Sequence, residues 1–120
     1  TKLMSDLLEK IADLNDLVVQ GQAMDAFEKY YDDNVVMQEN EFTPTIGKIA
    51  NRKREEAFFN NITEFRAAVP LKVSVGRNIT MVEWQYDYTH KEWGTRNYSQ
   101  ISVQEWKDGK IISEKFYYSN

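Results

Sequence analysis

The sequence contains no cysteine, one histidine and two prolines among 120 residues. Without cysteine the chain forms no disulfide, holds no thiolate-bound zinc or iron–sulfur cluster and has no thiol nucleophile. A single histidine excludes a metal site built from several imidazoles. No stretch approaches the ~18 consecutive apolar residues of a membrane-spanning helix. We therefore expect no metal, no organic cofactor and no membrane partner, and the lack of cysteine agrees with a cytoplasmic location.

Basic charge is also scarce. The chain has 15 Lys and Arg against 19 Asp and Glu, which gives a formal net charge of -4. A general nucleic-acid binder needs an excess of basic residues, so we predict no nucleic-acid partner. With 42% hydrophobic and 28% charged residues, the composition is typical of a globular protein, and the length fits a single domain over residues 1–120.

The first half of the chain has the apolar period of helices. Apolar residues recur on one helical face from residue 3 to residue 20, and Gly21 follows as a helix C-cap would. Pro70 is expected to stop the last helix of this half. The predicted elements are a helix over 3–20, a helix over 24–31, a short strand over 35–37, a long loop over 39–51 and a helix from 51 to Pro70.

After Pro70 the hydrophobic period changes from 3.6 to 2, which indicates strands. Asp108-Gly109 is the strongest hairpin signal, because both central residues of the favoured two-residue turn adopt positive φ. The predicted strands cover residues 71–75, 80–90, 96–107 and 111–118. Helices followed by such strands predict an α+β fold, in which a curved antiparallel sheet wraps around helices.

Several segments carry a family resemblance. Trp106 to Ile111 reads Trp-Lys-Asp-Gly-Lys-Ile and is followed by the aromatic run Phe116 to Tyr118. Two further segments carry the same resemblance. They are the stretch from Gly21 into Tyr31-Asp32-Asp33-Asn34-Val35 and the tripeptide Val82-Glu83-Trp84. Over almost its whole length the chain resembles the SnoaL-like family of the nuclear transport factor 2-like superfamily, which implies a cystatin-like, cone-shaped α+β barrel. This fold hosts isomerases, cyclases, dehydratases, epoxide hydrolases and non-catalytic binders, so it does not fix the function.

The resemblance suggests candidate residues. In a ketosteroid-isomerase-like alignment the catalytic base falls on Gln38, which has no titratable group. In a limonene-epoxide-hydrolase-like alignment the Arg-x-Asp motif falls on Gln85-Tyr86-Asp87, so Asp87 matches while Gln85 replaces the arginine. The second catalytic aspartate falls on Phe116, which is neither acid nor base. His90 is expected at the rim of the cone or at an interface rather than as a base.

The alignment also implies which strand face lines the cone. Gln85 and Asp87 would point inward, together with Tyr98, Gln100, Ser102, Gln104 and Trp106 of the next strand. The outer face would then be strongly apolar, which predicts a homodimer through the sheet, and would carry Val82, Trp84, Tyr86, Tyr88, Ile101 and Val103. Hydrophobicity alone favours the opposite phase, with Trp84, Tyr86 and Tyr88 in the core, and a shift of one residue reverses every assignment.

Two functions follow. In the first, the cone binds a small, partly apolar molecule and acts as an isomerase, cyclase or lyase without a cofactor. Asp87 would be the base next to a carbonyl, and Tyr98 or Gln38 would donate to the developing negative charge. The ligand-binding side chains would be Gln38, Gln85, Gln100, Gln104, Trp106 and Phe116. In the second, the chain is a non-catalytic module for dimerisation or protein interaction, because no complete catalytic set is present.

Overall fold

The computed structural model describes residues 2–119. Its elements are α1 (Lys2–Val19), α2 (Ala23–Tyr30), β1 (Tyr31–Glu39), β2 (Thr45–Ile46), α3 (Lys48–Asn60), β3 (Ile62–Gly76), β4 (Ile79–His90), β5 (Gly94–Lys107) and β6 (Lys110–Tyr117). The strands form one open six-stranded sheet in the order β2-β1-β6-β5-β4-β3. Neighbouring strands are antiparallel except for β1 and β6, which run parallel. The predicted α+β fold with a curved, mainly antiparallel sheet is confirmed.

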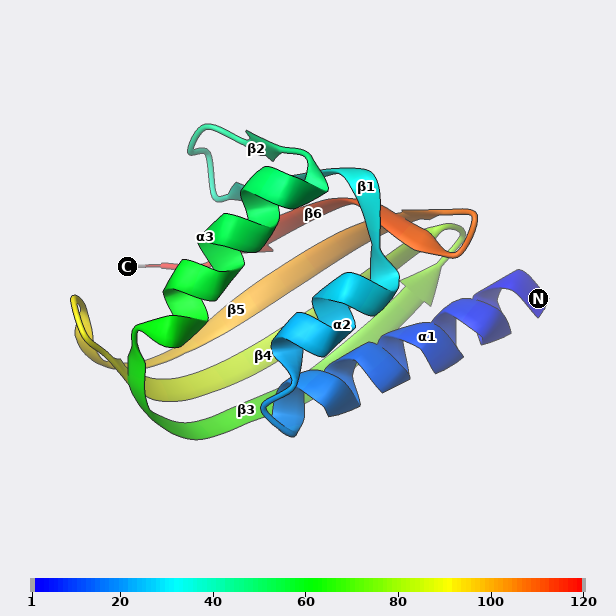
Figure 1. Cartoon of the computed structure of the whole chain (residues 1–120). Helices are drawn as coiled ribbons and strands as arrows, with labels where there is room; N and C mark the ends of the chain where they lie inside the picture. The colour runs from blue at the N-terminus through cyan, green and yellow to red at the C-terminus, as the bar shows by residue number, and fades with distance from the viewer. Residues whose placement is uncertain (1, 120) are drawn as a thin grey trace.

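The helices all lie on the concave side of the sheet (Figure 1). α1 and α2 form a pair over one part of this side, and α3 lies over another part (Figure 1). The apolar stripe of α1 buries Leu7, Ile11 and Leu14, as the period predicts. Gly21, at φ 79°, then reverses the chain into α2. The core lies between this helix pair and the sheet, where Val35, Val82 and Ile111 are completely buried.

The third helix is shorter than predicted. α3 ends at Asn60, and residues from Ile62 onward form the long edge strand β3 instead of continuing to Pro70. Pro70 lies within this strand, opposite Trp84 and next to a register shift. An edge strand tolerates proline, because a missing N–H on the open side breaks no ladder hydrogen bond. The predicted loop over 39–51 is also shorter, since β2 and the start of α3 fall inside it.

The hairpin between β5 and β6 turns at the predicted dipeptide. Asp108 has φ 52° and Gly109 has φ 78°, so both residues occupy the left-handed region. A Cβ on Gly109 would lie 3.6 Å from the Lys10 Cε, which is an ordinary contact. The glycine is therefore needed for its backbone conformation and not for space.

We expect Gly109→Ala to lower the free energy of unfolding by about 1–2 kcal/mol, the cost of a side chain in the left-handed region. Urea denaturation followed by circular dichroism measures this difference. Gly76→Ala is the matched control, because Gly76 lacks positive φ and a Cβ there would meet only the Ile79 carbonyl at 4.0 Å. If both variants lose the same stability, the turn does not depend on this glycine.

Candidate functional site

The concave side of the sheet and the helices over it border an open cavity of about 1300 Å³. Its walls come from the turn between α1 and α2, one face of α3 and the inner faces of β1, β3, β4, β5 and β6. The lining is rich in aromatic side chains, among them Phe58, Tyr86, Tyr88, Tyr98 and Phe116. A cavity of this size and lining is suited to a drug-sized, mainly apolar molecule.

The predicted inward orientation of Asp87 and Gln85 is wrong. Side chains directly opposite each other on antiparallel strands project to the same face. Tyr86 stands opposite Tyr98, and Asp87 stands opposite Asn97, so Asp87 and Tyr98 cannot share the cavity. The inner face of β4 carries Val82, Trp84 and Tyr88, each at most 3% exposed. Burial of these large apolar groups decides the phase of the strand, as hydrophobicity alone indicated.

Asp87 and Gln85 are held by neighbours on the convex face. The Asp87 Oδ1 accepts a hydrogen bond from the Arg66 Nε at 2.8 Å. The Gln85 Nε2 donates to the Asn97 Oδ1 at 2.6 Å, and its Oε1 accepts from the Ser99 hydroxyl at 2.8 Å. These cross-strand contacts stabilise the outer surface, and neither side chain borders the cavity.

The other candidate residues divide into two groups. Tyr98, Gln100 and Phe116 line the cavity. Gln38 borders it beside the turn that follows β1, and its Nε2 donates to the Phe42 carbonyl at 2.9 Å. Gln104 and Trp106 also face inward but are buried beneath the cavity, at 1% and 4% exposed, and do not line it.

A chain of buried hydrogen bonds runs below the cavity floor. The Trp106 indole donates to the Thr80 hydroxyl at 2.8 Å, and this hydroxyl donates to the Gln104 Oε1 at 2.7 Å. The Gln104 Nε2 then donates to the Glu114 Oε2 at 2.7 Å, and the Tyr31 hydroxyl donates to the Glu114 Oε1. Each side chain in this series of hydrogen bonds has a partner, which stable burial of polar groups requires.

Glu114 is the carboxyl group in this series of hydrogen bonds, where it accepts from both Gln104 and Tyr31. Burial raises the pKa of its carboxyl to about 7, although the hydrogen bonds from Tyr31 and Gln104 lower that pKa in part. The sequence analysis missed Glu114. This residue lies two residues before Phe116, the position on which the second catalytic aspartate was aligned, and projects to the same face of β6. The alternation of the strand was the signal that could have identified it.

Glu55 is the carboxyl that reaches the cavity. It lines the cavity from α3, where it follows the buried Asn51 by one turn and precedes Phe58 by almost another. Burial, together with the nearby charges of Glu114 and Glu39, raises the pKa of Glu55 to about 8. Among residues 2–119, no group forms a hydrogen bond or an ion pair with this carboxyl. A partly buried carboxyl without a partner, placed in a cavity wall, is a candidate general base or acid.

The sequence analysis did not single out Glu55, which directly follows the basic run Arg52-Lys53-Arg54. In the structure Glu28 engages Arg52 away from the cavity, whereas the ion pair of Arg54 with Glu39 lies in the cavity wall. The helical spacing of Asn51, Glu55 and Phe58 could have revealed the inward face. The loop and helix boundaries predicted for this region obscured it, since they began the helix at Asn51.

Two tyrosines form a hydroxyl pair on the cavity wall. The Tyr88 and Tyr98 hydroxyl oxygens lie 2.7 Å apart. One hydroxyl donates to the other, so one of the two protons remains free for a further acceptor. Burial and the bond to Tyr88 raise the pKa of Tyr98 well above its usual value, so the Tyr98 hydroxyl stays protonated at neutral pH. The cavity thus combines a carboxyl that can take a proton with a hydroxyl that can donate a hydrogen bond.

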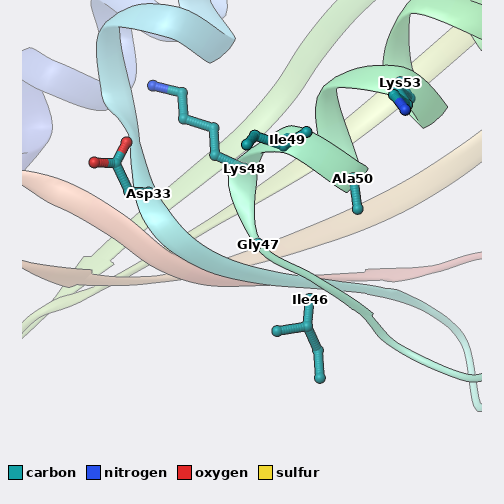
Figure 2. A pocket seen from close by; sticks show the side chains of 7 residues that line it. All are labelled: Asp33, Ile46, Gly47, Lys48, Ile49, Ala50 and Lys53. Atoms are coloured by element: carbon teal, nitrogen blue, oxygen red, sulfur yellow. The ribbon is translucent and has the colours of Figure 1, made fainter.

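A smaller hollow of about 410 Å³ lies on the surface at the start of α3. Figure 2 shows it bordered by Asp33, Ile46, Lys48 and Lys53, with Gly47 on the segment that leads into the helix. The Lys48 Nζ donates to the Glu28 carbonyl at 3.0 Å. This hollow contains neither Glu55 nor the tyrosine pair, and we assign no chemistry to it.

No cluster of three or more His, Asp or Glu side chains within residues 2–119 is arranged to hold a metal ion. None of the helices described is long and apolar enough to cross a membrane.

Comparison with known proteins agrees with this architecture. Residues 7–118 match the SnoaL-like domain family. A proposed SnoaL-like polyketide cyclase from Mesorhizobium loti is 26% identical, with a TM-score of 0.84 over 93% of this chain and 98% of that one. No curated protein matches the chain.

Two more distant structures share the fold. A proposed SnoaL-like polyketide cyclase from Jannaschia sp. CCS1 is 11% identical, with a TM-score of 0.85 over 99% of this chain and 89% of that one. An LEH-like epoxide hydrolase from M. tuberculosis is 12% identical, with a TM-score of 0.77 over 97% and 84% of the two chains. Since the family match covers nearly the whole chain, the protein belongs to the SnoaL-like domain family.

Proposed function

We propose that the cavity binds a small, mainly apolar carbonyl compound. In this proposal the protein removes a proton from a carbon next to the carbonyl, as isomerases and cyclases do. The observation that carries this proposal is the unpaired Glu55 carboxyl in an aromatic cavity, with its pKa raised to about 8. A general base works best when its pKa lies near the working pH, and Glu55 meets this condition.

The proposed step uses groups on opposite walls. Ionised Glu55 takes a proton from the carbon next to the carbonyl, and the electron pair of the broken C–H bond forms an enolate. The free proton of the Tyr88 and Tyr98 pair donates a hydrogen bond to the enolate oxygen, where negative charge develops. Glu55 then returns its proton to the same or a conjugated carbon. In ring closure, the enolate carbon instead attacks a second carbonyl carbon of the ligand, the π electrons of that carbonyl move to its oxygen, and this oxygen takes the proton from Glu55.

Similarity to a proposed polyketide cyclase supports this chemistry. Ring closure by carbon–carbon bond formation next to a carbonyl begins with the same proton removal. Epoxide hydrolysis through the Arg-x-Asp motif has no such support, because Asp87, the residue that matches this motif, lies on the convex face. We therefore assign the role of base to Glu55 and no longer to Asp87.

The proton transfer can be tested without the natural substrate. 2-Tetralone is an apolar ketone with acidic C–H bonds next to its carbonyl, and NMR in D₂O follows the exchange of those hydrogens. We expect the protein to accelerate this exchange above the buffer rate, and Asp87→Asn to leave the acceleration unchanged. An exchange rate equal to that of buffer, with ketone binding shown by NMR titration, would leave a binding module rather than an enzyme.

The convex face supports a second proposal, a homodimer formed through the sheet. Met81, Val69 and Tyr117 are each more than 40% exposed there, opposite Val103, Gln85 and Ile101 respectively. Of the residues predicted for this face, Ile101 and Val103 lie on it, whereas Trp84, Tyr86 and Tyr88 point inward. A mixed patch of aliphatic and charged groups remains, with the Lys72–Glu83 pair beside it.

We expect sedimentation equilibrium at micromolar concentration to give a dimer, and Met81→Glu to shift it toward monomer, because the charge would be buried in the interface. Leu3→Glu is a matched control, since Leu3 is 44% exposed on α1, on the other side of the sheet. A wild-type monomer, or equal dissociation in both variants, would exclude association through this face.

A further inference from the structure

The single histidine of the chain lies in the cavity wall. His90 ends β4 and is only 3% exposed, although the sequence suggested a rim or interface position. The Trp93 indole stacks on the imidazole at 4.0 Å between ring centroids and 11° between planes. Phe58 stacks near it from α3, at 5.7 Å and 23°. The imidazole is therefore covered by rings that come from different parts of the chain.

One nitrogen of this imidazole has a partner and the other does not. The Glu92 backbone N–H donates to the His90 Nδ1 at 3.1 Å, so the neutral ring carries its proton on Nε2. The Nε2 atom is buried, and no group among residues 2–119 accepts a hydrogen bond from it. A buried donor without an acceptor costs about 1–3 kcal/mol. An acceptor that arrives with a ligand would recover part of this cost.

The rings around His90 also indicate the shape of such a ligand. Phe58 contacts His90, Trp93 and Tyr88, with centroid distances of 5.7, 5.9 and 5.5 Å. Tyr88 belongs to the hydroxyl pair, so this aromatic cluster links the pair to the imidazole along one wall. Flat rings pack well on such a surface, in stacked or edge-to-face arrangements. Trp93 is 56% exposed, which leaves its indole room to shift when a ligand enters.

We propose that His90 is a ligand-binding residue, whose Nε2–H donates to an acceptor oxygen of a flat aromatic carbonyl compound that packs among Phe58, Trp93 and Tyr88. Trp93 moves aside to admit the oxygen. This inference rests on the proposed function, because it assumes that the cavity takes a carbonyl compound. It adds the class of that compound, since an aliphatic carbonyl compound would fill the ring-lined wall poorly.

Two matched probes separate the hydrogen bond from the ring contact. 2-Acetylnaphthalene and 2-ethylnaphthalene have the same ring and nearly the same shape, but only the first has a carbonyl oxygen. We expect the wild type to bind the ketone about tenfold more tightly, which corresponds to about 1.4 kcal/mol. His90→Phe keeps a flat ring and removes the donor, so it should bind the two compounds within about twofold of each other, with the affinity for 2-ethylnaphthalene retained.

A second measurement needs no variant. Because the chain has a single histidine, its imidazole signals in ¹⁵N NMR require no assignment. We expect the free protein to show the Nε2–H tautomer, and 2-acetylnaphthalene but not 2-ethylnaphthalene to shift the Nε2 signal. This readout remains decisive if His90→Phe fails to fold.

The outcomes are distinguishable. Three results would overturn the role of His90 alone. They are a ketone preference that persists in His90→Phe, an Nδ1–H tautomer in the free protein, and an Nε2 signal that the ketone does not shift. Proton exchange on 2-tetralone could still occur in that case. If the wild type binds neither naphthalene, the aromatic ligand class is wrong, whereas loss of exchange with intact naphthalene binding would remove only the proposed catalysis.

Discussion

Glu55→Gln is expected to slow the exchange of 2-tetralone hydrogens by about 100-fold or more at pH 9, because general-base catalysis by a positioned group contributes about 10²–10⁴-fold. Glutamine has the shape of the protonated acid but accepts no proton, so the cavity and ligand binding should persist. NMR in D₂O measures the initial rate of exchange, and a titration with the same ketone measures its affinity.

Asp87→Asn is the matched control for this experiment. It removes a carboxylate that is paired with Arg66 on the convex face, outside the cavity. If Asp87→Asn slows exchange as much as Glu55→Gln, or if Glu55→Gln retains the wild-type rate, the base has been misassigned.

The pH dependence adds a further test of Glu55. The ionised form is the base, so the exchange rate of the wild type should rise with pH and level off above about 8, the pKa of Glu55. In Glu55→Gln the residual rate should lack this rise. A wild-type profile that levels off near pH 4, as for an ordinary exposed glutamate, would contradict the raised pKa.

Stability should depend on pH in the opposite direction. The folded pKa of Glu55 is raised from 4.5 to about 8, so between these values the folded state keeps a proton that the unfolded state has lost. The contribution of Glu55 is fully favourable below about pH 4.5 and is lost as pH rises to about 8, by at most about 1.4 kcal/mol per pKa unit. Glu55→Gln should therefore raise the melting temperature more at pH 9 than at pH 5, as calorimetry would show.

Gln104→Leu is expected to lower the free energy of unfolding by about 2–6 kcal/mol, because two buried groups lose a partner and each such loss costs about 1–3 kcal/mol. The Gln104 amide connects the Thr80 hydroxyl to the Glu114 carboxylate through two bonds of 2.7 Å. Leucine replaces neither bond. The Gln104 bond also lowers the pKa of Glu114, so the loss should grow as pH rises above about 7. Urea denaturation at pH 6 and pH 8.5 measures both effects.

Gln100→Leu is the matched control on the same strand face. The Gln100 Nε2 donates to the Ser102 hydroxyl at 3.2 Å and to no ionisable group. We expect a loss of about 1 kcal/mol, the net contribution of an ordinary hydrogen bond, with little dependence on pH. Equal losses in the two variants would mean that the buried chain below the cavity contributes nothing beyond its individual bonds.

Local sequence patterns predicted the parts of the fold that local energetics control. The stripe of α1 at Leu7, Ile11 and Leu14 specifies a helix with one buried face, whatever packs against it. Asp108-Gly109 specifies a turn, because few other dipeptides adopt positive φ twice at low cost. Between residues 61 and 70 local patterns predicted a helix, whereas the structure has a strand from Ile62 onward. Ile62 to Val69 is compatible with both structures, and pairing with β4 decided for the strand.

The candidate site depended on contacts between distant residues. In β4 the sequence gives an alternation of aromatic and acidic residues, but not which of its two faces meets the helices. Pairing with β5 and the burial of Trp84 and Tyr88 fixed the aromatic face inward, which removed Asp87 from the cavity.

By itself, the sequence therefore determined the fold class, the family resemblance and the absence of cysteine chemistry, because these follow from composition and local periodicity. The tertiary structure alone decided which carboxyl could act. Asp87 and Glu55 are both ordinary acids in the sequence, but Asp87 pairs with Arg66, whereas Glu55 faces an aromatic cavity. A pKa depends on the solvent and charges around the group, and folding places those neighbours from segments far apart in the chain.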